Sequence, residues 1–127
     1  MMRTNGEPRT ITDRLSIDTI HDLLAKRRRR YTLYCLYLFA NPMRLPDVAD
    51  QVTEWEYGRP GEELLHERLR TYNDLYHSHV PKLDAVDVVE YSQAEDMIEL
   101  AHNASRLRPY LEWEAETDLN ATDTTPL

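Results

Sequence analysis

The spacing of apolar residues predicts a first helix that begins near Ser16. Ser16 is a favourable N-cap residue, and the carboxylate of Asp18 suits the first turn of a helix. Apolar residues then recur at intervals of three to four positions, at Ile17, Ile20, Leu23 and Leu24. This spacing places them on one side of the helix, which is therefore expected to pack against the rest of the protein.

The segment YTLYCLYLF, residues 31–39, is apolar on nearly every side when it is drawn as a helix. A helix of this kind lies in the centre of a domain rather than at its surface. A buried strand is the alternative, because a short apolar run rich in tyrosine suits both structures. No turn residue separates the segment from the helical pattern before it, which favours the helix. Cys35 is expected to be a buried, inert thiol.

Two amphipathic helices are predicted after the NPM sequence at residues 41–43, which ends the buried segment. The first has Pro46 in its first turn and one apolar stripe, formed by Leu45, Val48, Ala49, Val52 and Trp55. The second follows a loop that contains glycine and proline, and Pro81 is expected to kink or interrupt its last turn. Its apolar face is formed by Leu65, Leu69, Tyr72, Tyr76, Val80 and Leu83.

The period changes to two at residues 88–100, where apolar and charged residues alternate on both sides of a polar four-residue turn. This pattern predicts a β-hairpin. Residues 103–111 are expected to add a short closing helix. The last sixteen residues contain five acids and no base. The predicted organisation is a flexible N-terminal arm over residues 1–15, one domain over residues 16–111 and an acidic, disordered tail over residues 112–127.

The order of these elements is typical of a winged helix-turn-helix. Such an α+β fold is mainly helical, its second helix-turn-helix helix docks in a major groove, and its C-terminal two-stranded β-hairpin forms the wing. A generic small α+β domain without a role on DNA is the alternative. The core is predicted to contain Leu23, Leu24, Tyr31, Cys35, Leu38, Leu45, Val48, Leu69, Tyr72, Tyr76, Leu83, Val89, Ile98 and Leu100.

The composition adds a strong charge bias. The chain has 127 residues, enough for one domain, and a formal net charge of −8. Two of its 15 basic residues are lysines, Lys26 and Lys82, which leaves 13 arginines against 23 carboxylates. Acidic, lysine-poor surfaces are typical of proteins from a salt-loaded cytoplasm, although a moderately acidic mesophilic protein is the alternative. The N-terminus has no apolar signal region and the apolar run is too short to span a bilayer, so a cytoplasmic protein is expected.

Three sequence stretches resemble a small winged-helix domain that recurs in proteins of halophilic archaea. They are LLAKRRRRYTLYCLYLF, LPDVADQVTEWE and YHSHVPKLDAVDVVEY, and the similarity covers residues 16–111. Most proteins of that family are uncharacterised or regarded as transcriptional regulators. The resemblance implies a winged-helix fold and DNA binding, and it supplies no catalytic residue. The sequence departs from the family at Asp87, where the turn before the wing usually has glycine, but aspartate tolerates a left-handed backbone well.

The arginine run is the first candidate for DNA contact. By the resemblance, this helix start lies near the DNA backbone, so Arg28, Arg29 and Arg30 would contact phosphates and position the protein without reading sequence. Arg28 lies in line with Thr32 and is expected to be the most solvated of them. The alternative is that the arginines pair with local carboxylates, such as those of Asp22 and Glu54.

The predicted recognition helix, residues 64–80, supplies the second group of candidates. Arg70, Asn73, His77 and Ser78 are predicted to contact bases or phosphates of double-stranded DNA. Asp74 lies four residues after Arg70 and could neutralise it. The wing tip, residues 93–96, also carries two acids, which would repel phosphate; at molar salt, however, binding depends less on bulk positive charge.

No residue pattern indicates catalysis, a metal site or a cofactor. His77 and His79 are two positions apart, which points them to different sides of a helix. The predicted function is a non-enzymatic DNA-binding transcriptional regulator, and the alternative is a winged-helix module that binds a protein partner. A homodimer is expected because one small domain covers a short DNA site. Its predicted interface combines the sequence SRLRPYLEW with Ile17 and Ile20.

Overall fold

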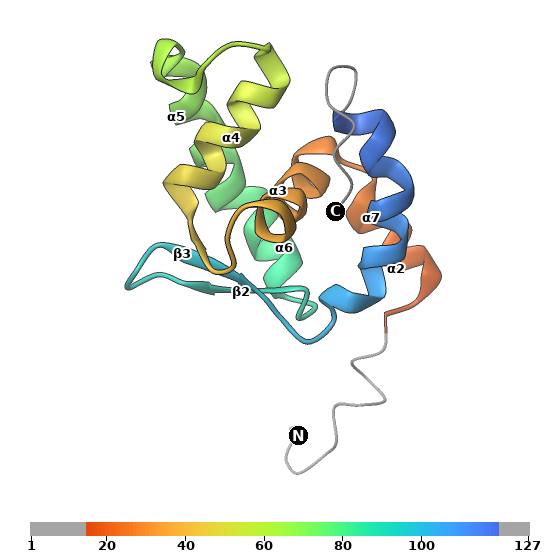
Figure 1. Cartoon of the computed structure of the whole chain (residues 1–127). Helices are drawn as coiled ribbons and strands as arrows, with labels where there is room; N and C mark the ends of the chain where they lie inside the picture. Colours follow the sequence, from red (N-terminus) through yellow and green to blue (C-terminus); the bar gives the residue numbers. More distant parts are fainter. Residues whose placement is uncertain (1–14, 120–127) are drawn as a thin grey trace.

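The computed structural model describes residues 15–119, which form a winged helix-turn-helix (Figure 1). Its α-helices are α2 (Ile17–Leu24), α3 (Arg27–Leu38), α4 (Leu45–Tyr57), α5 (Leu65–Asp74), α6 (Val80–Asp84) and α7 (Ala104–Leu119). A 3₁₀ turn, η1 (Gly61–Glu63), precedes α5, and a π-helical turn, η2 (Leu75–His79), joins α5 to α6. The strands are β1 (Met43–Arg44), β2 (Val89–Ser92) and β3 (Met97–Leu100).

Helices α2 and α3 confirm the first half of the prediction. The hydroxyl of Ser16 accepts a hydrogen bond of 3.0 Å from the backbone N–H of Thr19, so Ser16 is the N-cap of α2. The chain turns at Ala25 and Lys26, and α3 then passes through the middle of the molecule. The alternative of a strand at residues 31–39 is excluded. The hydrophobic core surrounds α3, and most side chains of this helix are buried.

The predicted apolar stripe of α4 is confirmed, whereas that of α5 is displaced. Leu64 and Leu75 are buried, but Leu65 and Leu69 are 58% and 54% exposed, so the prediction that Leu69 belongs to the core is wrong. The reason is that Leu64 and Leu65 are adjacent leucines, and the periodicity alone cannot decide which of them faces inward. The buried line instead passes through Leu64, Thr71 and Leu75. The other predicted core residues are buried or packed against the core.

The helical segment that follows α5 is not a regular α-helix. Between Leu75 and His79 it widens into a π turn, and Pro81 then lies in the first turn of α6. Pro81 lacks the N–H that a regular helix would use at this position, and the widened π turn lies directly before it. Residues 65–84 therefore run without a break in their helical path, and the expected interruption takes the form of a wider turn.

The wing is an antiparallel sheet with the strand order β1-β3-β2. Strands β2 and β3 form the predicted hairpin, in which Val89 lies opposite Leu100 and Ser92 opposite Met97. Strand β1, which pairs with β3, could not be predicted from the sequence, because a two-residue strand has no detectable alternation. Asp87 has φ of 61°, the left-handed conformation expected at the turn before the wing.

Helix α7 corrects the predicted C-terminal boundary. The helix continues past residue 111 to Leu119, and Leu107, Leu111 and Ala115 are buried along it. The prediction of a disordered tail is therefore wrong for residues 112–119. The many acids of this segment suggested disorder, but Ala115 lies at helical spacing from Leu107 and Leu111 and is buried with them. The predicted arm over residues 1–14 and the end of the tail over residues 120–127 lie outside the described residues. Leu15, assigned to the arm, is buried.

Candidate nucleic-acid interface

The outward face of α5 and η2 carries the predicted recognition residues. Arg70, Asn73, His77 and Ser78 are all exposed, and none forms a hydrogen bond or ion pair with another described residue. The ring of His77 packs edge-to-face on that of Tyr76, with 4.8 Å between the ring centroids. The polar groups of these four side chains are therefore free to contact a ligand along one side of the helix.

Thr71 and Asp74 do not belong to this outward face. Thr71 is fully buried, and its hydroxyl lies 3.0 Å from that of Thr53 on α4. Asp74 accepts hydrogen bonds from Arg28 and His79 and has none from Arg70. The predicted neutralisation of Arg70 by Asp74 is therefore wrong, because a partner from another helix occupies the carboxylate.

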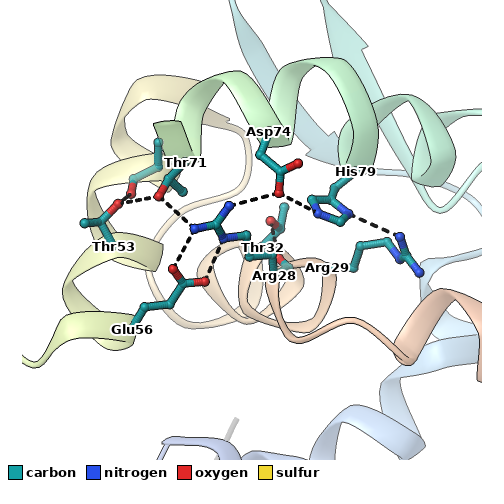
Figure 2. A network of polar contacts seen from close by, with 9 residues as sticks. Arg28, Arg29, Thr32, Thr53, Glu56, Thr71, Asp74 and His79 are labelled. Carbon is teal, nitrogen blue, oxygen red and sulfur yellow. Dashed lines mark hydrogen bonds and ion pairs between the residues drawn. The ribbon is translucent and has the colours of Figure 1, made fainter. Parts of the chain in front are cut away.

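Arg28 lies at the centre of a polar network that joins three helices (Figure 2). Its Nε and Nη2 donate to the two carboxylate oxygens of Glu56 at 2.7 and 2.8 Å, and its Nη1 donates to Asp74 at 2.9 Å. This fork-to-fork geometry is the strongest form of an arginine ion pair. The hydrogen bonds to Glu56 raise the pKa of Arg28, although burial opposes them. The expectation that Arg28 is the most solvated arginine of the run is wrong.

Arg29 and Arg30 hold the C-terminal end of α2. Arg29 is only 5% exposed and donates to the backbone carbonyls of Leu23 and Asp22 at 2.7 and 2.9 Å. Arg30 donates to the carbonyl of Leu24 at 2.6 Å. The last carbonyls of a helix lack partners in a further turn, and these two guanidinium groups donate to three of them. The carbonyl of Asp22 also accepts from the backbone N–H of Ala25 at 3.2 Å.

Arg30 also ties α3 to α7. Its Nε and Nη2 donate to Asp118 at 2.7 and 3.0 Å, and the hydroxyl of the buried Tyr34 donates to the same carboxylate at 2.7 Å. Burial alone would raise the pKa of Asp118, but the hydrogen bonds from Arg30 and Tyr34 lower it below the usual value. The alternative that the arginines pair with carboxylates agrees with this geometry, but the partners are Glu56, Asp74 and Asp118. Phosphate contact by Arg28, Arg29 or Arg30 stays a prediction.

His79 connects Asp74 to Arg29. Its Nε2 lies 2.8 Å from Asp74 and its Nδ1 lies 3.2 Å from Nη1 of Arg29. A guanidinium group can only donate, so Nδ1 accepts and Nε2 carries the proton that is donated to Asp74. Burial lowers the pKa of His79 below 6.5, although Asp74 opposes this shift, so the imidazole is neutral in the folded protein near pH 7.

Asp96, one of the two acids of the wing tip, points toward the protein rather than toward solvent. Asp96 accepts hydrogen bonds from the hydroxyls of Tyr72 on α5 and Tyr91 on β2, at 2.8 and 2.5 Å. Burial and the neighbouring carboxylate raise the pKa of Tyr72 to about 12. One of the two acids expected to repel phosphate therefore fixes the wing to α5, whereas Glu95 remains exposed.

A hollow of about 290 Å³ lies between α4, α5 and the wing tip. The exposed Leu65 and Leu69 form part of its wall, together with Pro46, Ala49, Asp50, Arg68, Tyr72 and Asp96. This hollow was not predicted from the sequence. The available signal was the pair of adjacent leucines, one more apolar residue than a single buried stripe needs.

Residues 15–119 contain neither a candidate metal site nor a helix that could span a membrane. No group of three or more histidine, cysteine, aspartate or glutamate side chains in this part of the chain could hold a metal ion. No helix in the same range is both long enough and apolar enough to cross a membrane. Burial raises the pKa of the Cys35 thiol well above its ordinary value.

Helices α4 and α5 with the β2–β3 hairpin define this molecule as a winged helix-turn-helix protein. Residues 21–99, more than half of the chain, match the family model described as "Domain of unknown function (DUF7344)", and the chain belongs to this family. The matched segment contains the arginine run, α5 and nearly all of the hairpin, whereas α7 lies outside it. No curated protein and no solved structure matches the chain.

Proposed function

We propose that this protein is a non-enzymatic, DNA-binding transcriptional regulator that docks α5 in the major groove of double-stranded DNA. The observation that supports this proposal is the outward face of α5 and η2, where Arg70, Asn73, His77 and Ser78 have no hydrogen-bond or ion-pair partner among the described residues. Arginine and asparagine are side chains that read guanine and adenine edges in the major groove. The helix that a winged helix-turn-helix places in the major groove is therefore also the helix that carries these exposed polar side chains.

The arginine run has a different role in this proposal. Arg28, Arg29 and Arg30 donate hydrogen bonds to α2, α4, α5 and α7, so they orient the recognition helix whether or not they also contact phosphates. DNA binding by so acidic a protein relies on specific contacts rather than on the release of counterions, which contributes little at molar salt. This reasoning supports the proposal that the protein works in a salt-rich cytoplasm, as the scarcity of lysine suggests.

The test measures binding to DNA in molar KCl. A preferred site is first selected from a pool of random duplexes, and fluorescence anisotropy then compares that site with random DNA. Asn73→Ala is expected to weaken binding to the preferred site by about 1–3 kcal/mol and to affect random DNA less. Arg108→Ala is the matched control, because Arg108 is an exposed arginine on α7 rather than on α5. Equal losses on both DNAs would remove the base-reading role of Asn73.

A second candidate function follows from the hollow beside α5. Exposed Leu65 and Leu69 next to an apolar hollow suit a side chain of a partner protein better than a phosphate backbone. In this alternative the winged helix is a protein-interaction module. Failure to bind any selected duplex between low and molar salt, together with a partner that is lost on Leu69→Ser, would favour the module over the regulator.

A further inference from the structure

A second exposed apolar surface is formed by α2 and α7. Trp113 is 81% exposed and Ile17 is 61% exposed. Beside Trp113 lies a hollow of about 240 Å³, whose wall is formed by His21, Leu24, Arg30, Tyr110, Trp113 and Glu114. Large aromatic side chains gain more from burial than other residues, so a tryptophan left this open marks an interaction surface.

Packing among residues 15–119 does not cover Trp113. The inward side of α7 is defined by Leu107, Leu111 and Ala115, which are buried against the core. Trp113 is two residues from Leu111, which places it about 200° around the helix, so α7 cannot bury both. The structure thus corrects the expected dimer surface, because Ile20, Leu107 and Leu111 are internal.

The hollow has firm walls. The rings of His21 and Tyr110 meet edge-to-face with 5.8 Å between centroids, which joins α2 to α7. Arg30 is fixed by its bonds to Leu24 and Asp118. Three of the lining residues are thus already held in place before a ligand enters, and this lowers the cost of binding.

We propose that this surface binds a second copy of the chain, with Trp113 of each copy filling the hollow of the other. A two-fold interface uses the same patch on both subunits, so the patch must contain both a projection and a cavity. Trp113 and the hollow meet this requirement because they lie side by side on one surface. A patch that carried only a projection would fit an unrelated partner equally well.

The charges at the rim favour the same occupant. Exposed Lys26 follows Leu24, which lines the hollow, by two residues and forms no ion pair with another described residue, whereas Glu114 lines the hollow opposite no cation but Arg30. A two-fold axis brings the basic rim of one copy toward the acidic rim of the other. In Figure 1 this surface lies on the opposite side of α3 from α4 and α5, so a dimer leaves the proposed DNA-binding face open.

The test is the mass of the full chain in concentrated KCl, measured by light scattering over a range of concentrations. The expected species is a dimer of twice 15.0 kDa. Trp113→Ala is expected to raise the dissociation constant at least 100-fold and give the 15.0 kDa monomer, with an unchanged circular dichroism spectrum because Trp113 has no place in the core. Leu69→Ser, which removes an exposed leucine from α5, is the control and should leave the dimer intact.

Charge reversal provides a second measurement. Lys26→Glu should weaken the dimer about tenfold, and adding Glu114→Lys to it should restore most of the loss. A wild-type monomer at every concentration, a dimer that survives Trp113→Ala or an equal effect of Leu69→Ser would each overturn the proposal. These outcomes do not depend on DNA binding, which anisotropy measures separately for a monomer or a dimer.

Discussion

Asp74 and His79 lie five residues apart in one helical segment, yet their side chains share a hydrogen bond of 2.8 Å. In a regular α-helix, residues five apart point about 140° away from each other. The π turn between Leu75 and His79 widens the helix and brings the imidazole back over the carboxylate. Irregular helix geometry at the end of α5 is thus coupled to the network that holds Arg28.

Removal of Arg28 is expected to destabilise the fold. Arg28→Ala removes the cation shared by the partly buried carboxylates of Glu56 and Asp74, and a loss of about 2–3 kcal/mol is expected after allowance for solvent access. Arg28→Lys should recover only part of this, because an ammonium group cannot form the two-point bond. Chemical denaturation measures the effect.

Arg70→Ala is the matched control for Arg28, since Arg70 is exposed and forms no ion pair with a described residue. The free energy of unfolding of the Arg70→Ala protein should remain within about 0.5 kcal/mol of the wild-type value. Equal stability of the Arg28→Ala protein and the wild type would show that the network contributes nothing to the fold.

His79 is expected to make stability depend on pH above the range of the carboxylates. Its pKa is lowered in the folded state, so the unfolded chain binds the proton more tightly. Stability is therefore complete above the unfolded pKa of about 6.5 and falls as the pH decreases from about 7 toward 5. A proton on Nδ1 would face Arg29 and, beyond it, Arg28, while Asp74 attracts it from the other nitrogen.

Denaturation at a series of pH values checks this dependence. His79→Gln should flatten the curve between pH 7 and 5, whereas His102→Gln, at an exposed position, should leave it unchanged. A second decline below about pH 4 is expected in all variants, since the lowered pKa values of Asp74 and Asp118 give stability that is lost as these carboxylates gain protons. An identical slope in the wild type and His79→Gln would exclude His79 as its source.

The carboxylate of Asp118 is expected to be essential for stability although it lies near the end of α7. Asp118→Ala removes the partner of Arg30 and of the fully buried hydroxyl of Tyr34, and a loss of about 3 kcal/mol is expected. Glu116→Ala, two residues earlier and exposed, should change little. Thermal unfolding compares the two, and similar melting temperatures would contradict the role of Asp118.

Tyr72 is expected to resist ionisation. Because burial and Asp96 raise its pKa to about 12, the tyrosinate absorbance of Tyr72→Phe should differ from that of the wild type only above about pH 11. The same substitution should cost about 1 kcal/mol, since it removes one hydrogen bond between α5 and the wing. A difference that appears near pH 10 would show that the contact is not kept in solution.

The sequence predicted most of the fold because its signals are local. Ser16, Pro46 and the alternation at residues 89–100 each mark an element through a property of one or a few neighbouring residues. The displaced face of α5 could not be predicted in this way, because Leu64 and Leu65 are chemically alike and only the position of α4 distinguishes them.

The candidate site was predicted in part. The exposed positions of Arg70, Asn73 and His77 agree with a simple helical projection. The partners of the arginines could not be derived, since Glu56, Asp74 and Asp118 lie 28 to 88 residues away in the chain. Such pairings depend on the tertiary structure, which the periodicity of one helix does not contain.

The first turn of α3 contacts every helix that carries a proposed interface. Arg28 reaches α4 and α5, Arg29 and Arg30 reach α2, and Arg30 reaches α7. The two proposed interfaces are thus parts of one rigid unit rather than lobes that can swing. A dimer formed through Trp113 would hold its two α5 helices at a fixed separation. Such a dimer would accept paired DNA half-sites at a single spacing, and an insertion of five base pairs between them, half a helical turn, would place the second half-site on the opposite side of the duplex.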